Sequence, residues 1–388
     1  ASGVKAGDKI IYIDKEKVAG NGVDNQKVMS LLKGKSGTDV EIKVLRGKKE
    51  KHFYITRGTI PIETVVAHYM DGDIGYIKLD QFSIKSAEEF AKAAESLKQK
   101  GMKKMILDLR NNGGGVLGSA VQIIDAFLEK GKLIVKTKGV NKEESKYLST
   151  GSQSLLNIPL VVLINESSAS ASEIVSGAIQ DNDRGTIIGR RSFGKGLVQE
   201  DSRLRDGSVI RLTVARYYTP TGRCIQRSYE NGYDEYRRDD KRWERGELYK
   251  VDSSLFVDSL KFKTPKGKVV YGGGGIMPDI FVPYDSLKTN FELLRYSNSG
   301  CIQAFAFDYV SNKRKKWRSI NSFKNSFFIS EKVMKSFIQY SIKHYDINYN
   351  EVEFKNIKTY VASMIKAEIA RQLWIEQGFY QIYNLSDK

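Results

Sequence analysis

The chain has 388 residues, 40% of them hydrophobic and 11% aromatic, which is the composition of a folded protein with room for two or three domains. No apolar run approaches the roughly 20 residues of a membrane-spanning helix, so we expect no transmembrane segment in the chain as given, and a soluble one. The net charge of +17 favours anionic surfaces, but basic residues are spread along the chain. We therefore read the excess as solvated surface and expect no nucleic-acid function.

Residues that bind metals in proteins are sparse. The chain has three histidines and two cysteines, Cys224 and Cys301, which lie far apart in the sequence with no Cys-x-x-Cys pair. A structural zinc site needs four such ligands at characteristic spacings. We therefore expect neither a metal nor a cofactor.

Residues 1–58 alternate short apolar strands with turns. We predict strands over 9–13, 40–46 and 51–56, and a short amphipathic helix over 25–33. This pattern predicts a small β-rich domain.

The next stretch alternates strands with helices. A strand is predicted over 74–79 and a second over 105–109. Ser86 and Glu89 form a capping-box pattern at the start of the helix between them, and another helix is predicted over 117–130. Strand and helix alternating at this spacing indicate an α/β layer with parallel strand pairs.

A strand over 208–218 is followed by a polar segment over 229–257, which we read as an excursion or long loop. A strand–turn–strand pattern follows over 268–283. Helical periodicity over 331–347 and 357–378 then predicts a separate helical region. The predicted organisation is a β-rich domain, an α/β core and a helical region, over residues 1–58, 59–285 and 286–388.

The chain is organised around the stretch 159–199. Leu160–Ile164 is an apolar run of strand length, Ser167–Ser172 is a cluster of serines and alanines, and Glu173–Gln180 has helical spacing. In a strand–turn–helix unit, a small polar residue in the turn lies at the edge of the sheet, beside the free N–H groups at the start of the helix. A serine there is a candidate nucleophile, and by composition Ser167, Ser168, Ser170 and Ser172 all remain open.

A serine hydroxyl needs a neighbouring base before it can attack a carbonyl. None of the histidines lies beside a suggestive motif, and His68 reads as a strand residue. Lys195 lies between Gly194 and Gly196, near apolar residues, and burial lowers the pKa of a lysine. Lys195 is therefore the candidate base, although a surface lysine in a flexible loop is the alternative reading.

Two glycine-rich loops do not fit nucleotide binding. Gly189–Lys195 has the spacing of a phosphate-binding loop, but Gly196 stands where that loop needs Ser or Thr, and no helix follows. Gly113–Gly115 lacks the Gly-x-Gly-x-x-Gly spacing of a dinucleotide site. We therefore expect neither loop to bind a nucleotide, and both remain available for a site of another kind.

Several motifs together carry a family resemblance. They are, in chain order, Leu107–Gly115, Asn165–Glu173, Gly189–Gln199, Tyr217–Arg223 and Gly275–Asp279. In this order they resemble the carboxyl-terminal processing, or tail-specific, serine proteases, which use a serine–lysine pair. The resemblance covers roughly residues 1–285 and includes a partial PDZ-like start. It implies a crotonase/ClpP-like α/β peptidase core with a PDZ-like β-rich N-terminal part, to which the periodicity adds a C-terminal helical region.

The resemblance also assigns roles to single residues. It makes Ser170 the nucleophile, Lys195 the general base and Gln199 the residue that orients Lys195. The backbone N–H groups of Ala171 and Gly115, with Gly114 as the alternative to Gly115, would stabilise the oxyanion.

The chain departs from the family pattern in two places. Ser167 stands where the family has glycine, and the loop that captures a peptide carboxylate in PDZ domains is not found ahead of the first strand.

The resemblance implies a serine endopeptidase that cleaves proteins near unstructured apolar C-terminal tails through a seryl acyl-enzyme. Its partners would be proteins or peptides with exposed C-terminal tails. The helical region would be free for self-association or an adaptor. An extracytoplasmic location, periplasm or cell envelope, follows from the resemblance alone. The alternative function is a catalytically inactive, peptide-binding scaffold of the same fold.

Overall fold

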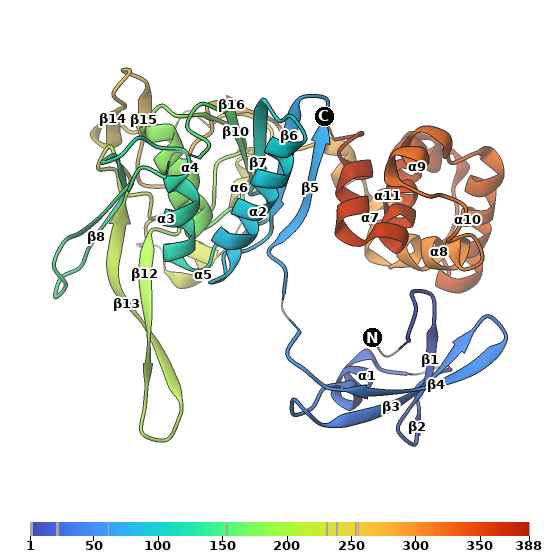
Figure 1. The fold of residues 1–388 in the computed structure, drawn as a ribbon. Helices are drawn as coiled ribbons and strands as arrows, with labels where there is room; N and C mark the ends of the chain where they lie inside the picture. The colour runs from blue at the N-terminus through green and yellow to red at the C-terminus, as the bar shows by residue number, and fades with distance from the viewer. Residues whose placement is uncertain are drawn as a thin grey trace. The chain divides into compact units, whose positions relative to one another are not determined.

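The structure, a computed structural model, describes residues 3–20, 23–60, 62–152, 154–229, 232–237, 240–252, 254 and 256–387. The chain divides into two compact units (Figure 1). One unit is Glu63–Ser286, and the other combines Ala1–Ile62 with Leu287–Lys388.

A six-stranded sheet in the order β16-β11-β10-β7-β6-β5 forms the centre of the unit Glu63–Ser286. Its strands are β5 (Val65–Asp71), β6 (Ile74–Leu79), β7 (Lys104–Asp108), β10 (Leu160–Ile164), β11 (Thr186–Gly189) and β16 (Ile280–Phe281). Neighbours from β6 to β16 pair in parallel, and β5 is an antiparallel edge strand. Because the carboxyl ends of parallel strands meet at one edge, the loops after β7, β10 and β11 converge there, where α/β proteins commonly bind ligands.

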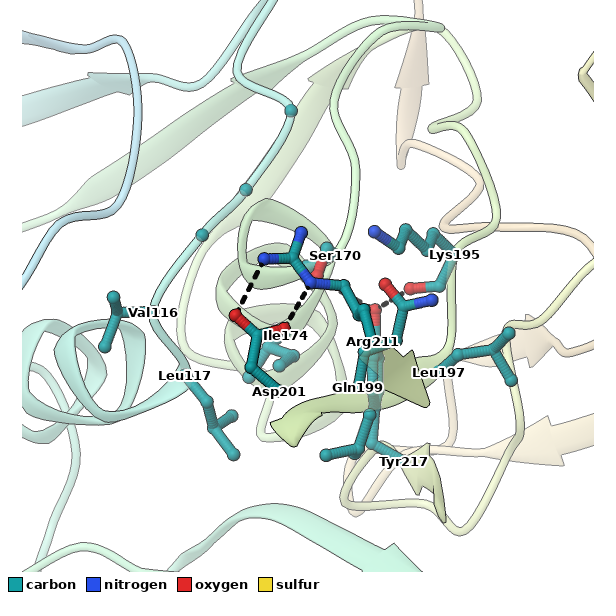
Figure 2. Close-up of a pocket in the computed structure, with 14 residues that line it drawn as sticks. Val116, Leu117, Ser170, Ile174, Lys195, Leu197, Gln199, Asp201, Arg211 and Tyr217 are labelled. Carbon is teal, nitrogen blue, oxygen red and sulfur yellow. Dashed lines mark hydrogen bonds and ion pairs between the residues drawn. The ribbon is translucent and has the colours of Figure 1, made fainter. Parts of the chain in front are cut away.

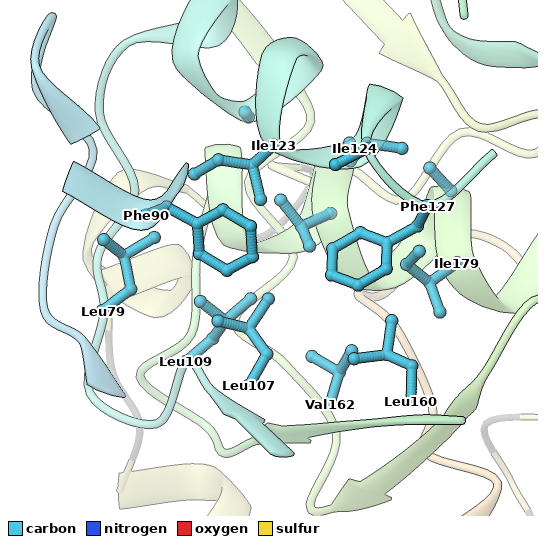
Figure 3. Close-up of a cluster of buried hydrophobic side chains, with 14 of the residues drawn as sticks. Leu79, Phe90, Leu107, Leu109, Ile123, Ile124, Phe127, Leu160, Val162 and Ile179 are labelled. Atoms are coloured by element: carbon cyan, nitrogen blue, oxygen red, sulfur yellow. The ribbon is translucent and has the colours of Figure 1, made fainter. Parts of the chain in front are cut away.

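Three helices pack on this sheet, namely α2 (Ser86–Gln99), α3 (Leu117–Asp125) and α4 (Ala171–Asp181). Their apolar faces meet the side chains of β7 and β10 in one core (Figure 3). Phe90 from α2 and Ile123 from α3 lie in this core, as does Val162 from β10. Fully burying one such side chain contributes about 1.5–3 kcal/mol to stability. The packing of α4 in this core therefore holds the start of that helix in place.

A second, antiparallel sheet in the order β12-β13-β8-β9 belongs to the same unit. Its strands are β8 (Leu133–Lys138), β9 (Ser145–Leu148), β12 (Leu197–Arg203) and β13 (Val209–Tyr218). The strands β12 and β13 form a long hairpin (Figure 1). The rest of the unit holds α5 (Tyr233–Arg237), α6 (Asp240–Glu244), the 3-10 turn η2 (Asp258–Leu260) and the pair β14 (Lys261–Lys263) and β15 (Val269–Tyr271).

The N-terminal segment is a four-stranded sheet in the order β2-β1-β3-β4. It comprises β1 (Lys9–Ile13), β2 (Glu16–Lys17), β3 (Asp39–Arg46), β4 (Lys49–Thr56) and the helix α1 (Asn25–Leu32). The side chain of Asp24 caps α1 by accepting a hydrogen bond from the N–H of Gln26 at 3.0 Å. Its small core includes Ile13, Ile42 and Val44. The predicted strands are thus confirmed, and the likeness to a PDZ domain stays a prediction.

The C-terminal segment is helical. It holds the 3-10 turn η3 (Ser286–Thr289), α7 (Phe291–Asn298), α8 (Cys301–Val310), α9 (Ile320–Ser326), α10 (Glu331–Tyr345) and α11 (Glu351–Tyr383). Aromatic side chains such as Tyr296, Phe305 and Phe337 dominate its core. The helix α11 breaks at Trp374 and Ile375, which leave helical backbone angles. Within the described residues, no helix is both long and apolar enough to cross a membrane.

The predicted fold class is confirmed: an α/β core carries a β-rich N-terminal part and a helical C-terminal region. The capping box at Ser86 is wrong, because Lys85 is the N-cap of α2 and Glu89 instead accepts hydrogen bonds from Thr64 and Val65. The Ser86 hydroxyl donates to Thr64 Oγ1 at 2.8 Å.

Helix boundaries also differ from the predictions. The helix predicted over 117–130 ends at Asp125, and the one predicted over 357–378 runs from Glu351 to Tyr383. The segment 229–257 is more than a loop: it carries α5 and α6, and its side chains of Arg242, Glu247 and Leu248 are buried.

Candidate active site

The turn between β10 and α4 holds Ser170 in an unusual backbone conformation. Its φ and ψ angles are 55° and −113°, although it is not a glycine. Such strained residues cost about 1–3 kcal/mol and cluster at functional sites. A similar strained turn from strand to helix exposes the nucleophile in another class of serine hydrolases. The conformation therefore marks Ser170 as a candidate nucleophile independently of any sequence motif.

The other serines of this turn have structural surroundings. The buried Ser168 hydroxyl donates to the carbonyl of Leu109 at 2.8 Å, and the buried Ser172 hydroxyl donates to the carbonyl of Asn112 at 2.8 Å. Ser167 is exposed. Of these four serines, Ser170 is the one that lines the cavity described below.

The loop after β7 is fastened to the serine turn by Asn112, which is fully buried. Its side chain donates to the Leu79 carbonyl and accepts from the Gly114 N–H, each at 2.9 Å. Its carbonyl accepts from the Ala169 N–H at 3.0 Å. One asparagine therefore sets the distance between the glycine loop and the residue that precedes Ser170.

The backbones of Gly114 and Gly115 lie closer to neighbouring atoms than those of residues with a Cβ atom could. Both have positive φ angles, 95° and 143°. A Cβ on Gly114 would lie 2.7 Å from the Cβ of Ser170, and one on Gly115 would lie 2.0 Å from the Phe82 carbonyl oxygen. The backbone of this loop can therefore come next to Ser170 only as glycine.

Two backbone N–H groups beside Ser170 find no acceptor among the residues that the structure describes. Among the described residues, neither the Gly115 N–H nor the Ala171 N–H donates a hydrogen bond, whereas the Gly114 N–H is taken by Asn112. Unused donors at a helix start are suited to an oxyanion. This pairing favours Gly115 over Gly114 as the partner of Ala171.

Lys195 lies in the loop between β11 and β12, which is anchored from within the fold by Glu173. The Glu173 carboxylate is fully buried and accepts from the Gly194 and Lys195 N–H groups at 2.7 and 2.8 Å, and from the Ser192 hydroxyl at 2.6 Å. It also accepts from the Ser170 N–H at 2.8 Å. Burial raises the pKa of this carboxyl above its ordinary value, although these hydrogen bonds act in the opposite direction.

Tyr217 on β13 ties the same two segments together from the other side. Its hydroxyl lies 3.1 Å from the Ser170 carbonyl and is hydrogen-bonded to the Lys195 carbonyl. Burial raises the pKa of the Tyr217 hydroxyl well above its ordinary value, so the hydroxyl remains protonated and can donate.

A cavity of about 590 Å³ brings the predicted site residues together (Figure 2). Ser170, Lys195, Gln199 and Gly113–Gly115 all line it. In Figure 2 the Lys195 side chain extends toward Ser170. No hydrogen bond is formed among the Ser170, Lys195 and Gln199 side chains in this part of the described structure.

Beyond these residues and Tyr217, the lining is apolar except for one ion pair. Val116, Leu117 and Ile174 supply apolar surface, and the exposed pair of Asp201 and Arg211 lies across the hairpin at 2.7 Å. Among the described residues, no group of three or more His, Cys, Asp or Glu side chains could hold a metal ion.

Sequence reasoning missed the roles of Glu173, Asn112 and Tyr217. For Glu173 a signal was present, since Ser170 and Glu173 have the S-x-x-E spacing of a capping box, and the structure forms the half of that motif in which Glu173 accepts from the Ser170 N–H. Asn112 and Tyr217 lie within motifs of the family resemblance, but no role could be read for them, because most of their partners are distant in sequence.

The chain matches two family models and resembles known proteases. The model of peptidase family S41 matches residues 73–232, and that of a family of unknown function (DUF8443) matches residues 293–375. The chain is 36% identical over 227 residues to the carboxy-terminal processing protease CtpA of Bacillus subtilis, covering 58% of this chain and 48% of the relative. It is 39% identical over 232 residues to the carboxy-terminal-processing protease of Bartonella bacilliformis, covering 58% and 52%.

The chain thus spans about half the length of the curated relatives it matches. Among solved structures, the photosystem II D1 C-terminal processing protease aligns with 26% identity and a TM-score of 0.40, covering 74% of this chain and 66% of the other.

Proposed function

We propose that this chain, whose residues 73–232 match the model of peptidase family S41, is a serine endopeptidase in which Ser170 is the nucleophile and Lys195 the general base. The observation that carries the proposal is the shared cavity, which both side chains line beside two unused N–H donors. The strained backbone of Ser170 supports the same assignment.

The proposed reaction begins when the uncharged Lys195 amine takes the proton of the Ser170 hydroxyl. The Ser170 oxygen bonds to the scissile carbonyl carbon, and the carbonyl electron pair becomes an oxyanion that accepts hydrogen bonds from the Gly115 and Ala171 N–H groups. The C–N bond then breaks, and Lys195 returns its proton to the departing amine. Water, deprotonated by Lys195, cleaves the remaining ester and restores the Ser170 hydroxyl.

Gln199 is proposed to orient the Lys195 amine. It lies on β12 and its side chain lines the same cavity. An amide oxygen can accept a hydrogen bond from an amine in either protonation state, so Gln199 can hold Lys195 throughout the cycle.

The proposed substrates are proteins with unstructured, apolar C-terminal tails. The support is the apolar lining from Val116, Leu117 and Ile174, together with the names of the relatives. An extracytoplasmic location is proposed on the resemblance alone. Residues 286–388 lie outside the resemblance, and an adaptor or self-association role is proposed for them as a separate helical segment. The boundaries at residues 58 and 285 are proposed from the change in sequence pattern at each.

The decisive experiment compares Ser170→Ala with Ser167→Ala in cleavage of an unfolded protein that ends in an apolar tail. We expect Ser170→Ala and Lys195→Ala to abolish cleavage with little change in the thermal transition. The exposed Ser167 serves as the matched control and should keep its activity. Persistent cleavage by Ser170→Ala would refute the assignment.

The same assay distinguishes the peptidase from the second candidate function, which is the inactive peptide-binding scaffold. The absence of a hydrogen bond between the described Ser170 and Lys195 side chains favours it, although catalytic hydrogen bonds often tighten only when substrate binds. Tight binding of the tail without any cleavage by the unmodified protein would support the scaffold. Cleavage of the tail by the unmodified protein, lost in Ser170→Ala, would support the peptidase.

A further inference from the structure

The Lys195 loop, here defined as residues 190–196, is hydrogen-bonded to a segment that is distant in sequence. This segment comprises residues 227–229, 232–237 and 240–248, and all but its first two residues lie within the stretch that the sequence presents as a polar excursion. It is called the clamp segment below. Its contacts are to the backbone of the Lys195 loop as well as to side chains, so the two segments are joined at defined points.

The first joint is a buried triad of two arginines and one glutamate. Arg191 donates to Glu247 through Nε and Nη2, each at 2.7 Å, which is a bidentate pair. Arg242 also donates to Glu247 Oε1, through its Nη2 at 2.7 Å. The exposed fractions of the Arg191, Arg242 and Glu247 side chains are 10%, 5% and 5%.

Arg242 then reaches past the carboxylate to the main chain of the Lys195 loop. Its Nη2 donates to the Arg191 carbonyl at 2.7 Å, and its Nη1 donates to the Ser192 carbonyl at 3.3 Å. The guanidinium fork is rigid and planar, so these bonds fix the orientation of the two peptide groups. Both peptide groups lie three to four residues before Lys195.

The second joint is formed by Arg227. Its N–H donates to the Gly194 carbonyl at 3.0 Å, and its guanidinium lies 4.2 Å from the ring centre of Phe193. The same guanidinium lies 5.1 Å from the ring centre of Tyr236, in the clamp segment. Phe193 and Gly194, immediately before Lys195, are therefore held as well.

Stability alone gives a weak reason for such a triad. Removing charges from water costs several kcal/mol for each ion, and a buried ion pair is often no more stabilising than apolar residues of the same volume. Although burial acts to raise it, the hydrogen bonds and positive charges of Arg191 and Arg242 lower the pKa of Glu247, so the carboxylate stays charged. What the triad supplies is directional hydrogen bonds to one short loop.

We propose that Glu247 is a positioning residue for Lys195. It holds Arg191 and Arg242 in the orientation that fixes the Lys195 loop, and the clamp segment is thereby a part of the catalytic unit. The inference rests on the proposed function, because it needs Lys195 to be the base. Near-attack geometry is demanding: a misplacement of about 1 Å can cost roughly a hundred-fold in rate.

The test measures how fast a fluorophosphonate probe labels Ser170 in the full chain. Glu247→Gln keeps the shape but removes the charge, and we expect labelling to slow by roughly ten- to a hundred-fold. Arg242→Lys keeps the positive charge and loses the fork that reaches Arg191 and Ser192. It should also slow labelling, and it carries the test if Glu247→Gln does not fold.

Asp181→Asn is the matched control. It breaks the ion pair with Arg223, which is 2.7 Å long and has exposed fractions of 0% on both sides, but it touches no atom of the Lys195 loop. We expect a comparable fall in melting temperature with labelling within two-fold of the unmodified protein. If labelling slowed as much in Asp181→Asn as in Glu247→Gln, Glu247 would act only through the overall stability of the protein.

A double-mutant comparison separates positioning from any other effect. If Glu247 acts through Lys195, then adding Glu247→Gln to Lys195→Ala slows labelling no further. Unchanged labelling in a folded Glu247→Gln or Arg242→Lys protein, or a slowing that multiplies with that of Lys195→Ala, overturns the inference. Cleavage that persists in Ser170→Ala would instead overturn the proposed function. Because that result comes from a different variant, the two failures can be told apart.

Discussion

The backbone N–H groups of Ser170 and Lys195 donate to the same atom, Oε2 of Glu173, each at 2.8 Å. The two residues come from different loops and are brought into register by one carboxylate. The arrangement also places a capping interaction at the start of α4, since Glu173 is the third residue of that helix. Helix capping and the alignment of the candidate nucleophile and base are therefore the same interaction.

Glu173→Gln is expected to lower activity strongly and to weaken the site. A carboxylate accepts from all four of its donors, whereas an amide presents its own N–H₂ group to some of them. Unmade hydrogen bonds to a buried charged group cost about 1.5–3 kcal/mol each. Serine labelling and thermal unfolding, measured on the same sample, check this. Labelling at the parental rate would contradict the alignment role.

The pH dependence of stability provides a second test of Glu173. Because burial raises its pKa above the ordinary 4.5, the folded state holds this proton more tightly than the unfolded chain does. The Glu173 contribution therefore makes the free energy of unfolding fall as pH rises from about 4.5 through the raised pKa. In Glu173→Gln this fall should be absent from denaturant titrations over that range. An identical slope in both proteins would count against the shift.

Several elements could be predicted from the sequence because their signals are local. The strands β1, β6 and β10 have the predicted boundaries, since each is a short apolar run flanked by turn residues. The grouping of Ser170 with Lys195 followed from the strand–turn–helix pattern and the family resemblance. These signals need no knowledge of distant partners.

Other features were beyond local reasoning because they depend on distant pairs. Arg242 and Glu247 sit in a charged run that reads as solvated surface, yet both are buried against Arg191, some fifty residues earlier. Ser86 and Glu89 show the reverse error, as their capping-box pattern is overridden by tertiary hydrogen bonds to Thr64. Charge pairing across the fold cannot be read from composition.

Gly115→Ala is expected to abolish labelling and destabilise the glycine loop. The new Cβ would lie 2.0 Å from the Phe82 carbonyl oxygen, at a φ of 143° that is strained for any side chain. The matched control is Gly118→Ala in α3, where a Cβ meets nothing within 4 Å. There alanine should stabilise the helix by about 0.5–1 kcal/mol. Equal tolerance of both changes would contradict the close approach.

Asp108→Asn is expected to destabilise the protein by about 3–5 kcal/mol, because it leaves buried positive charge without its partner. Asp108 is 1% exposed and accepts from Tyr76 at 2.7 Å and from the Arg110 Nη2 at 2.6 Å. The Lys78 amine lies 3.9 Å from it and is also buried. Denaturant unfolding measures the loss. The control Asp73→Asn breaks an exposed pair with Lys104 and should change little.

The pH behaviour of Asp108 has the opposite sign to that of Glu173. Although burial acts to raise it, the charges and hydrogen bonds of Arg110, Lys78 and Tyr76 lower the pKa of Asp108 below 3.8. Its contribution is therefore complete above that value and is lost as pH falls through the lowered pKa. Acid unfolding curves of the parent should show this loss, which Asp108→Asn removes.

Ile375→Gly is expected to stabilise the helical segment, against the usual effect of glycine. Ile375 interrupts α11 with φ 51° and ψ −150°, a region open to glycine and costly for a β-branched residue. Its side chain is 68% exposed, so little burial is lost. Relief of strain of about 1–3 kcal/mol should exceed the added entropy of the unfolded chain, which is about 1 kcal/mol or less.

The control for this change is Ile342→Gly in the interior of α10, where the backbone is helical and the side chain is 46% exposed. Glycine there should cost roughly 1 kcal/mol. Native-state hydrogen exchange of the α10 and α11 amides reports both effects in the full chain, because it resolves the stability of each helix separately. Faster exchange in α11 of Ile375→Gly would mean that the break is unstrained and that the isoleucine supports it.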